Sequence, residues 1–298
     1  MTSTTTSRPA AAPLSVQRLL CENPSPMTLE GTTTYVLAGR DAVAVVDPGP
    51  ADHPEHVEAV LTAVAGRPVA QILVTHRHRD HTGAAPALAE RTGAPVRGFD
   101  PEQGLPGADG LFPHPLSDRE RIDLGGAAVE LVHTPGHTSD SVSLFLPQAQ
   151  LVAESGDERL GPGPAGPAAM MLTGDTLLGR GTTMLDHPDG TLTDYLASLE
   201  CLIGYGDALL LPAHGPAQPS LAKTARRYLA HRHERLDQVR ALIAEARQGT
   251  TTASSPAAPE DPEQLGRMLY GEDSPVPQRV TTRIAAAQLD HLRRLGEI

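Results

Sequence analysis

Cysteine is scarce in this sequence, and long apolar runs are absent. Its two cysteines, Cys21 and Cys201, are far apart and lack the spacing of a metal site, so we expect no disulfide framework. No run of about 18 uninterrupted apolar residues occurs, which argues against a membrane-spanning helix. The first residues also lack the basic-then-apolar layout of a secretory signal. We therefore expect a cytoplasmic protein without membrane contacts.

Positive charge is also scarce, except near the C-terminus. The 298 residues include 24 Lys and Arg against 36 Asp and Glu, which gives a net charge of −12. Half of the basic residues lie between positions 220 and 298. Because an acidic body repels polyanions at long range, a nucleic-acid substrate would need local basic patches or bound metals to be captured.

The chain length and the apolar pattern predict a mixed α/β domain followed by a smaller helical part. A single core stops growing near about 250–300 residues. We expect a mobile tail at 1–13, a catalytic domain at 14–219, and a C-terminal part at 220–298 that consists of a long helix, a linker at 249–262 and a small module. Predicted strands are 32–37, 42–46, 71–74, 129–132, 142–146, 170–172 and 209–211. Predicted helices are 54–64, 83–91, 194–203, a long one from Ser220, 263–270 and 281–295.

A cluster of histidine and aspartate follows the predicted strand at 71–74. It reads Thr75-His76-Arg77-His78-Arg79-Asp80-His81 and hands over to a helix rich in small residues. Open α/β sheets place ligands where a strand passes to a helix. Four donors in one such turn can converge within a few ångströms, which suits metal ions better than a single proton relay. The alternative is a solvated surface cluster of histidines.

Three more candidate ligands lie at the ends of strand-like runs. His137, Asp175 and His214 each follow apolar residues and sit beside glycine or proline. A lone histidine in such a place is more often structural. Three residues in the same setting as the cluster instead predict that the carboxyl ends of several strands deliver ligands to one place, enough for two metal sites.

In this order, His-x-His-x-Asp-His, Gly-His, Gly-Asp and His-Gly resemble the motifs of the metallo-β-lactamase superfamily. The resemblance implies an α/β fold, the αββα sandwich of that family. It implies His76, His78 and His137 on one metal, Asp80, His81 and His214 on the other, and Asp175 bridging both. It also places Asp47 near the site, whereas we interpret His133 as structural.

Within the superfamily, the sequence most resembles the β-lactamase-like protein 2 group, whose members include a mitochondrial endoribonuclease. This resemblance rests on the segments 28–35, 75–81, 174–183 and 228–232 and covers nearly all of the chain from Leu29. It implies that residues 269–298 form a small winged-helix-like domain. Arg180 departs from the pattern, because an acidic residue can occur there.

The implied chemistry is hydrolysis at two metal ions, which we expect to be Zn²⁺, with Fe or Mn as alternatives. Water that bridges two such ions becomes a hydroxide near neutral pH and attacks the substrate. Asp80 is then the expected proton acceptor, because one of its oxygens can stay free, and Asp175 is the second catalytic carboxylate. Thr75, Thr82 and Thr138 are candidates to hold the imidazoles in place.

Two substrate classes remain open at this point. RNA is favoured by the group resemblance and by the basic residues of the long helix, which are Lys223, Arg226, Arg227, Arg232 and Arg235. The candidate substrate-binding residues are Arg180, Arg226 and Arg227. An acyl thioester, as in glyoxalase II or acyl-carrier thioesterases, suits the same metal set. The absence of a cysteine ligand excludes the cysteine-containing β-lactamases and leaves β-lactam hydrolysis a minor option. A single-iron persulfide oxygenase is the other minor option. A binding module with a structural metal is the non-enzymatic alternative, and no obligate protein partner is expected.

Overall fold

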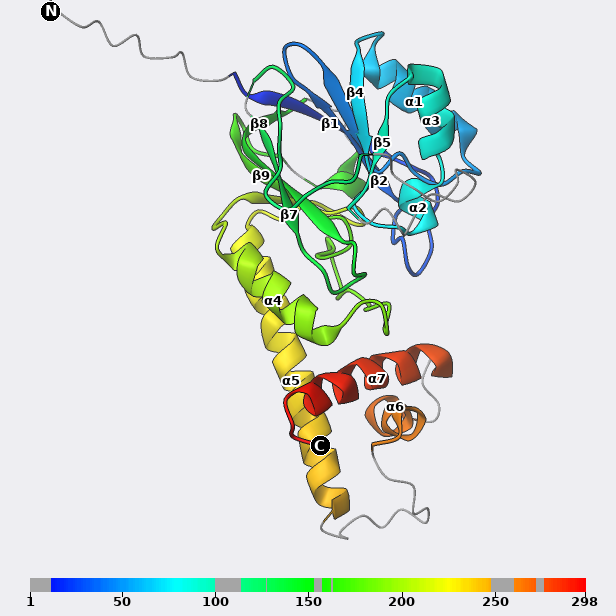
Figure 1. Ribbon diagram of the computed structural model, residues 1–298, viewed down its shortest axis with the longest axis vertical. Coiled ribbons are helices and arrows are strands. Elements are labelled where there is room, and N and C mark those ends of the chain that lie inside the picture. The colour runs from blue at the N-terminus through cyan, green and yellow to red at the C-terminus, as the bar shows by residue number, and fades with distance from the viewer. Residues whose placement is uncertain are drawn as a thin grey trace, which may run out of the picture.

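The computed structural model describes residues 12–99, 114–126, 128–152, 157–161, 163–247, 260–271 and 276–298. The predicted tail at 1–13 therefore lies almost wholly outside the described residues, and so does most of the predicted linker at 249–262. Figure 1 shows a body built on a sheet at one end of the molecule, with a long helix that leads away from it to two further helices.

In the described part of the chain, ten strands form one mixed, curled sheet. They are β1 (Leu14–Leu20), β2 (Thr33–Ala38), β3 (Val43–Val46), β4 (Val69–Leu73), β5 (Val96–Arg97), β6 (Arg121–Ile122), β7 (Val129–His133), β8 (Val142–Leu151), β9 (Ala168–Leu172) and β10 (Leu209–Leu211). The main path runs β10-β9-β8-β1-β2-β3-β4-β5, while β6 and β7 extend from β8. The long strand β8 pairs with β7, β9 and β1, so it joins the two halves of the sheet.

Alternating side chains show that both faces of this sheet are buried. In β3, Ala44 and Val46 pack into the central core, whereas Val43 and Val45 face a second apolar cluster. A strand that is buried on both faces needs apolar residues at consecutive positions, and this run of valine and alanine supplies them. The same alternation holds in β9, where Met170 and Leu172 face the central core and Met171 faces the opposite side.

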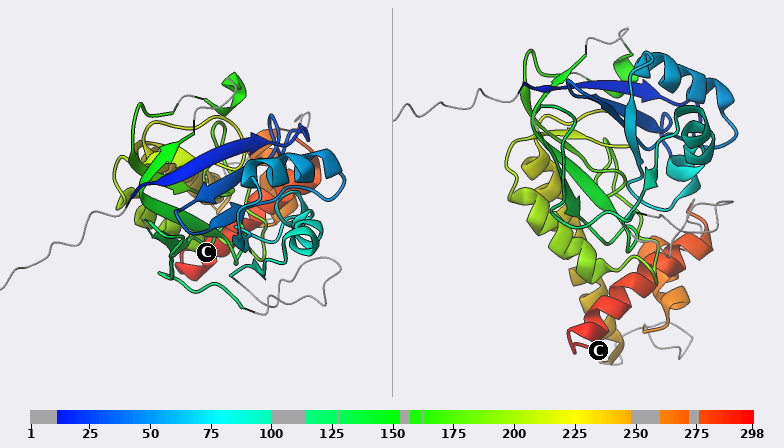
Figure 2. Two further views of the ribbon diagram at one scale, coloured as in Figure 1. Left: turned by 90° about the horizontal axis from the view of Figure 1, so that it is seen from above. Right: turned by 45° about the horizontal axis from the view of Figure 1, so that its top comes forward.

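Helices cover both outer faces. On one side lie α1 (Pro54–Val64), the short α2 (Arg79–Thr82) and α3 (Ala85–Thr92), and on the other α4 (Leu192–Ile203) and the start of α5 (Leu221–Arg247). A 3-10 turn lies at Glu158–Leu160. The right view of Figure 2 shows these two helical layers on opposite sides of the body. The predicted αββα sandwich is confirmed.

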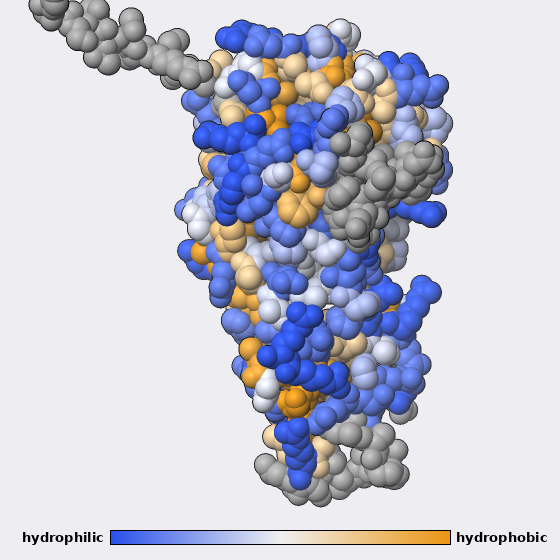
Figure 3. Space-filling model, viewed as in Figure 1, coloured by the Kyte–Doolittle hydropathy of each residue, from blue (hydrophilic) through white to orange (hydrophobic). Residues whose placement is uncertain are grey.

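Helices also form the C-terminal part, as predicted. Beyond the body, α5 continues as one helix to Arg247, and α6 (Pro262–Tyr270) packs against α7 (Gln278–Arg294). The described residues after 247 contain these two helices and no strand, so the wing of a winged-helix domain stays a prediction. Figure 3 shows a largely hydrophilic surface over these helices. No described helix has the length and apolarity needed to cross a membrane.

One basic residue of α5 does not lie on the surface. Arg232 is buried and donates a hydrogen bond to the backbone carbonyl of Thr183, and its guanidinium carbon lies 5.1 Å from the centre of the Tyr195 ring. The expectation that Arg232 adds to a basic helix face is therefore wrong. Its position within the helix turns it toward the body, where it joins α5 to α4 and to the loop at Thr183.

We predict that Arg232→Ala lowers the free energy of unfolding by about 2 kcal/mol, because it removes a charged hydrogen bond and a cation–π contact. Urea unfolding followed by circular dichroism measures this change. Arg226→Ala, an exposed position on the same helix, is the matched control and should change stability by less than about 0.5 kcal/mol. Equal losses for both variants would contradict the structural role of Arg232.

Candidate metal centre

The turn after β4 places four donors in two neighbouring groups. His76 and His78 belong to a first group with His137 and Asp175, and Asp80 and His81 belong to a second group with His214. The ligand atoms within each group all lie within 4.8 Å of one another. The structure therefore brings together the seven residues that the sequence motifs single out.

Glycines let the other strand ends approach this turn. Asp175 follows β9, and Gly174 before it has φ +49°; a Cβ there would lie 2.6 Å from Thr75 Oγ1. His137 lies between β7 and β8 after Gly136, which has φ +137° and no room for a Cβ beside Tyr195. Only glycine adopts these conformations at so short a distance without strain. The two glycines thus allow Asp175 and His137 to reach the centre.

Three imidazole nitrogens converge in the first group. His78 Nδ1 lies 3.0 Å from His76 Nε2 and 3.1 Å from His137 Nε2. Asp175 Oδ2 completes the group at 3.6 Å from His137 Nε2. Three ring nitrogens so close together need a shared electrophile to hold them, and a metal ion with N and O ligands fits this need.

Asp175 also faces the second group with its other oxygen. Its Oδ1 lies 3.2 Å from His214 Nε2 and 3.5 Å from His81 Nε2, and Asp80 Oδ2 lies 3.3 and 3.4 Å from the same two nitrogens. One carboxylate oxygen of Asp175 is therefore turned toward each group. This is the arrangement that a carboxylate shared by two metal ions requires.

Each ring is fixed through the nitrogen that points away from the centre. His76 Nδ1 donates to Thr75 Oγ1 at 3.1 Å, His81 Nδ1 to Asp47 Oδ2 at 2.9 Å, and His137 Nδ1 to the carbonyl of Met184 at 2.6 Å. His214 Nδ1 donates to the carbonyl of Gly31 at 3.1 Å, and His78 Nε2 lies 3.4 Å from Asp186 Oδ2. With those protons placed outward, all five inward nitrogens carry lone pairs, as metal ligands must.

Two buried polar atoms of the donor set lack a hydrogen-bond partner among the described residues, which is a test of whether a metal ion fits here. These atoms are His81 Nε2 and Asp175 Oδ1. An unsatisfied buried polar atom is costly, and two that face each other across 3.5 Å call for a bound cation between them. The donor set of five imidazoles and two carboxylates fits such a cation.

The electrostatics of the two groups agree with this fit. Burial lowers the pKa of His76 and of His137, which keeps both rings neutral. At His81 burial acts in the same direction, but nearby carboxylates, Asp80 foremost, outweigh it and raise the pKa well above its ordinary value. At His214 Asp175 and Asp80 likewise outweigh burial and raise the pKa to about 9. The second group therefore attracts positive charge.

Of the residues expected to support the ligands, Thr75 and Asp47 contact ligand rings, at His76 Nδ1 and His81 Nδ1. Asp47 is buried; its Oδ1 accepts from Thr75 N and its Oδ2 from Thr75 Oγ1, both at 2.8 Å. Thr138 Oγ1 instead pairs with Ser141 Oγ at 2.7 Å, and Thr82 Oγ1 donates to the carbonyl of His78. His133 stacks on Phe99, with ring centres 3.9 Å apart, in keeping with a structural role.

The residues expected to bind substrate lie apart from the ligands. Arg180 is paired with Glu30, and its side chain is about half exposed. Arg226 and Arg227 are exposed on α5, where the Arg227 guanidinium lies over the ring of Tyr228. No described contact joins these three arginines to the seven donors, so their contact with substrate remains a prediction.

The sequence motifs did not reveal a group of charges at the edge of the centre. Arg77, between the two histidines of the turn, pairs with Asp186 and Asp189. Both carboxylates lie in the segment Asp186-His187-Pro188-Asp189-Gly190, whose turn-forming composition was the available signal. Met184 in the same loop holds His137 through its backbone carbonyl, which side-chain patterns cannot show.

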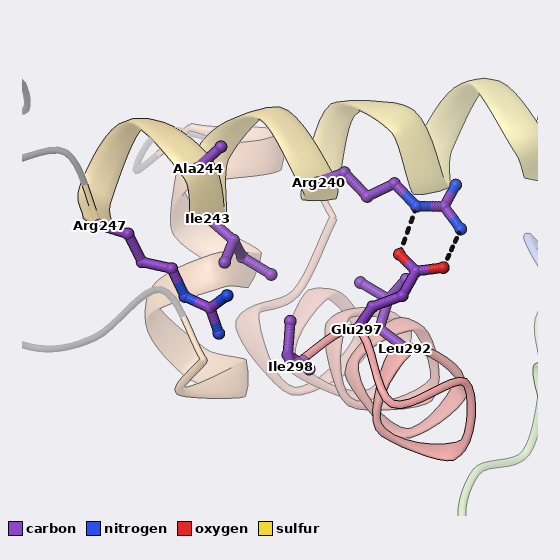
Figure 4. Close-up of a pocket in the computed structure, with 7 residues that line it drawn as sticks. All are labelled: Arg240, Ile243, Ala244, Arg247, Leu292, Glu297 and Ile298. Carbon is purple, nitrogen blue, oxygen red and sulfur yellow. Dashed lines mark hydrogen bonds and ion pairs between the residues drawn. The ribbon is translucent and has the colours of Figure 1, made fainter.

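A pocket of about 470 Å³ lies elsewhere, between α5 and the C-terminal end of α7 (Figure 4). Its lining contains none of the seven donors; it consists of Arg240, Ile243, Ala244, Arg247, Leu292, Glu297 and Ile298. Arg240 is paired with Glu297 through two contacts of 2.7 and 2.8 Å, and Arg247 is paired with Glu260. With both arginines neutralised, the pocket offers no comparable chemistry.

Known proteins resemble this chain in sequence and in fold. A family model for the metallo-beta-lactamase superfamily matches residues 27–153. A beta-lactamase-like protein 2 homolog of Drosophila melanogaster is 32% identical over 241 residues, which cover 76% of this chain and 72% of the relative. An atrochrysone carboxyl ACP thioesterase of Cryptosporiopsis sp. is 27% identical over 226 residues, covering 75% of this chain and 61% of that protein.

Among solved structures, a beta-lactamase domain protein from Burkholderia ambifaria has a TM-score of 0.69 and 21% sequence identity to this chain. The superposition covers 98% of this chain and 92% of the other, so the shared fold includes the C-terminal helices.

We predict that Asp47→Asn weakens the affinity for zinc by about tenfold or more, because an amide has one acceptor oxygen and cannot accept from both Thr75 N and His81 Nδ1 as the carboxylate does. Competition with a chromophoric chelator measures this affinity. Asp52→Asn, an exposed aspartate five residues away, is the control and should bind zinc as the unmodified protein does. An unchanged affinity for Asp47→Asn would refute the role of Asp47.

Proposed function

We propose that this chain, which belongs to the metallo-β-lactamase superfamily and is a metal-dependent hydrolase, is a dinuclear zinc enzyme. His76, His78 and His137 would hold one ion, Asp80, His81 and His214 the other, and Asp175 would belong to both. The observation that supports this most is that the two oxygens of Asp175 face one group each. Zinc is proposed because imidazole and carboxylate groups are among its usual ligands.

The chemistry that two bound zinc ions would supply is Lewis acidity and a lower pKa of bound water. The remaining work falls to side chains of this protein. Asp80 Oδ2 is turned toward His81 and His214, which leaves Asp80 Oδ1 as the atom that accepts a proton from the attacking water. Asp47, Thr75 and the carbonyls of Gly31 and Met184 keep the rings in one orientation, so that the centre is organised before substrate arrives.

RNA phosphodiester is our first proposal for the substrate. The exposed positive charges of Arg226 and Arg227 on α5 support it, as does the similarity of residues 28–35, 75–81 and 174–183 to the motifs of the β-lactamase-like protein 2 group. An otherwise acidic body needs such charges to capture a polyanion. The buried Arg232 no longer contributes to this argument.

An acyl thioester is the second candidate. It is favoured by the similarity to the atrochrysone carboxyl ACP thioesterase, which spans 75% of this chain. The same metal groups can polarise a thioester carbonyl as readily as a phosphoryl oxygen. A small thioester would not need the charges on α5, and this difference separates the two candidates.

We predict that Arg226→Ala/Arg227→Ala weakens the binding of labelled single-stranded RNA and flattens its salt dependence, by about 1.4 in the slope of log K against log salt. Turnover of a minimal acyl thioester should stay within about twofold. Filter binding over a salt series and a thiol-release assay provide the two measurements. Arg40→Ala/Arg91→Ala removes the same charge from exposed positions of the body and is the matched control.

Asp80→Ala lacks the proposed proton acceptor, so it should abolish turnover of either substrate. It is the control that separates turnover at the metal centre from background activity. If the double arginine variant loses turnover of both RNA and the thioester, the helix has a structural role and the support for RNA as the substrate is removed. Turnover of the thioester alone by the unmodified protein would establish the second candidate instead.

A further inference from the structure

The five imidazoles of the centre differ in what holds them. Four are held by a threonine hydroxyl, a buried aspartate and two backbone carbonyls. His78 is different, because its side chain is 34% exposed and its outward nitrogen faces a partly exposed carboxylate, that of Asp186, at 3.4 Å. The orientation of His78 therefore depends on what holds Asp186.

Asp186 lies in a loop that serves two ligands of the first group. This orienting loop, residues 184–190, accepts a hydrogen bond from His137 Nδ1 at the carbonyl of Met184. Asp186 N donates to the carbonyl of His137 at 2.8 Å, and Gly190 N donates to the carbonyl of Asp186 at 3.1 Å. The backbone of the loop is thereby tied to His137, and the Asp186 side chain is directed at His78.

Two arginines from distant parts of the chain hold the Asp186 carboxylate. Arg77 contacts Oδ2, the oxygen that also faces His78. Arg283 of α7 contacts the other oxygen, with Nη1 2.7 Å from Oδ1. In Figure 1 the loop that precedes α4 reaches toward α7. The contact of Arg283 with Asp186 places this helix beside the loop that holds His78 and His137. Arg77 is shared between Asp186 Oδ2 and Asp189, whereas Arg283 holds Asp186 Oδ1. The contact of Arg283 at this second oxygen fixes the rotation of the Asp186 carboxylate.

We propose that Arg283 is a positioning residue for the metal centre: it holds Asp186 Oδ1 and thereby keeps Oδ2 toward His78 Nε2, so that docking of α7 raises the metal affinity of the first group. The proposal rests on the dinuclear centre of the proposed function. It assigns to the C-terminal helices a role at the centre although none of the seven donors lies beyond His214.

The competing interpretation is that Arg283 only docks α7 on the body. Another contact already does this, since His291 Nδ1 lies 2.8 Å from Thr193 Oγ1 at the start of α4. Mere docking would make loss of Arg283 lower stability without an effect on metal affinity. A role through Asp186 would make the effects of the two residues on metal affinity non-additive.

The experiment uses the full chain with Arg283→Gln, Asp186→Asn, both together, and Arg283→Lys. Arg279→Gln is the matched control, because Arg279 is exposed one turn earlier on the same helix and its loss removes the same charge. Zinc affinity of the metal-free proteins is measured by chelator competition, and urea unfolding of the same metal-free samples reports stability.

We expect Asp186→Asn to weaken the binding of one of two zinc ions by about tenfold and Arg283→Gln by about threefold to tenfold. Arg283→Lys should restore part of the loss, Arg279→Gln should bind as the unmodified protein does, and the double variant should bind no more weakly than Asp186→Asn alone. Unchanged affinity in Arg283→Gln, or an equal further loss in the Asp186→Asn background, would overturn this proposal alone. Failure of the unmodified protein to bind two zinc ions would overturn the proposed function as well.

Discussion

Asp175 presents one carboxylate oxygen to each of two buried groups of imidazoles, and the surrounding structure is organised around that position. Burying a carboxylate is costly unless positive charge or hydrogen bonds compensate it. Here Asp175 Oδ1 is buried without a hydrogen-bond partner among the described residues and faces His81 and His214. Gly174 lets the end of β9 place Asp175 close to Thr75. Thr75 Oγ1 in turn accepts from His76 Nδ1 and donates to Asp47 Oδ2. A change at this point therefore reaches both groups.

Much of the fold could be predicted because its elements carry strong local patterns. The helix at 54–64 begins with proline and repeats its apolar residues at helical spacing, and the structure has it at the predicted bounds. Strand β1 (Leu14–Leu20) was not predicted, since its ends are set by pairing with β2 and β8 rather than by its own sequence. The two-residue strands β5 and β6 are too short to show any period.

The ligands could be predicted for a similar reason, since several polar residues follow apolar runs and sit beside glycine or proline. What the sequence could not reveal are the partners on the outer side of the rings. Gly31 and Met184 contribute through backbone carbonyls, and Asp186 and Arg283 meet only because the chain folds back over 97 residues. Arg232 is the opposite case: a basic residue in a charged helix predicts exposure, but its place in the helix turns it inward.

In the proposed centre one shared carboxylate joins two metal groups in a single chain. Calorimetric titration of the metal-free full chain with zinc, paired with elemental analysis of the saturated protein, tests this. We predict two zinc ions per chain, and for Asp175→Asn a weakening at both steps, because the two groups share that side chain. Saturation at one zinc per chain, or an Asp175→Asn variant in which only one of two steps changes, would contradict it.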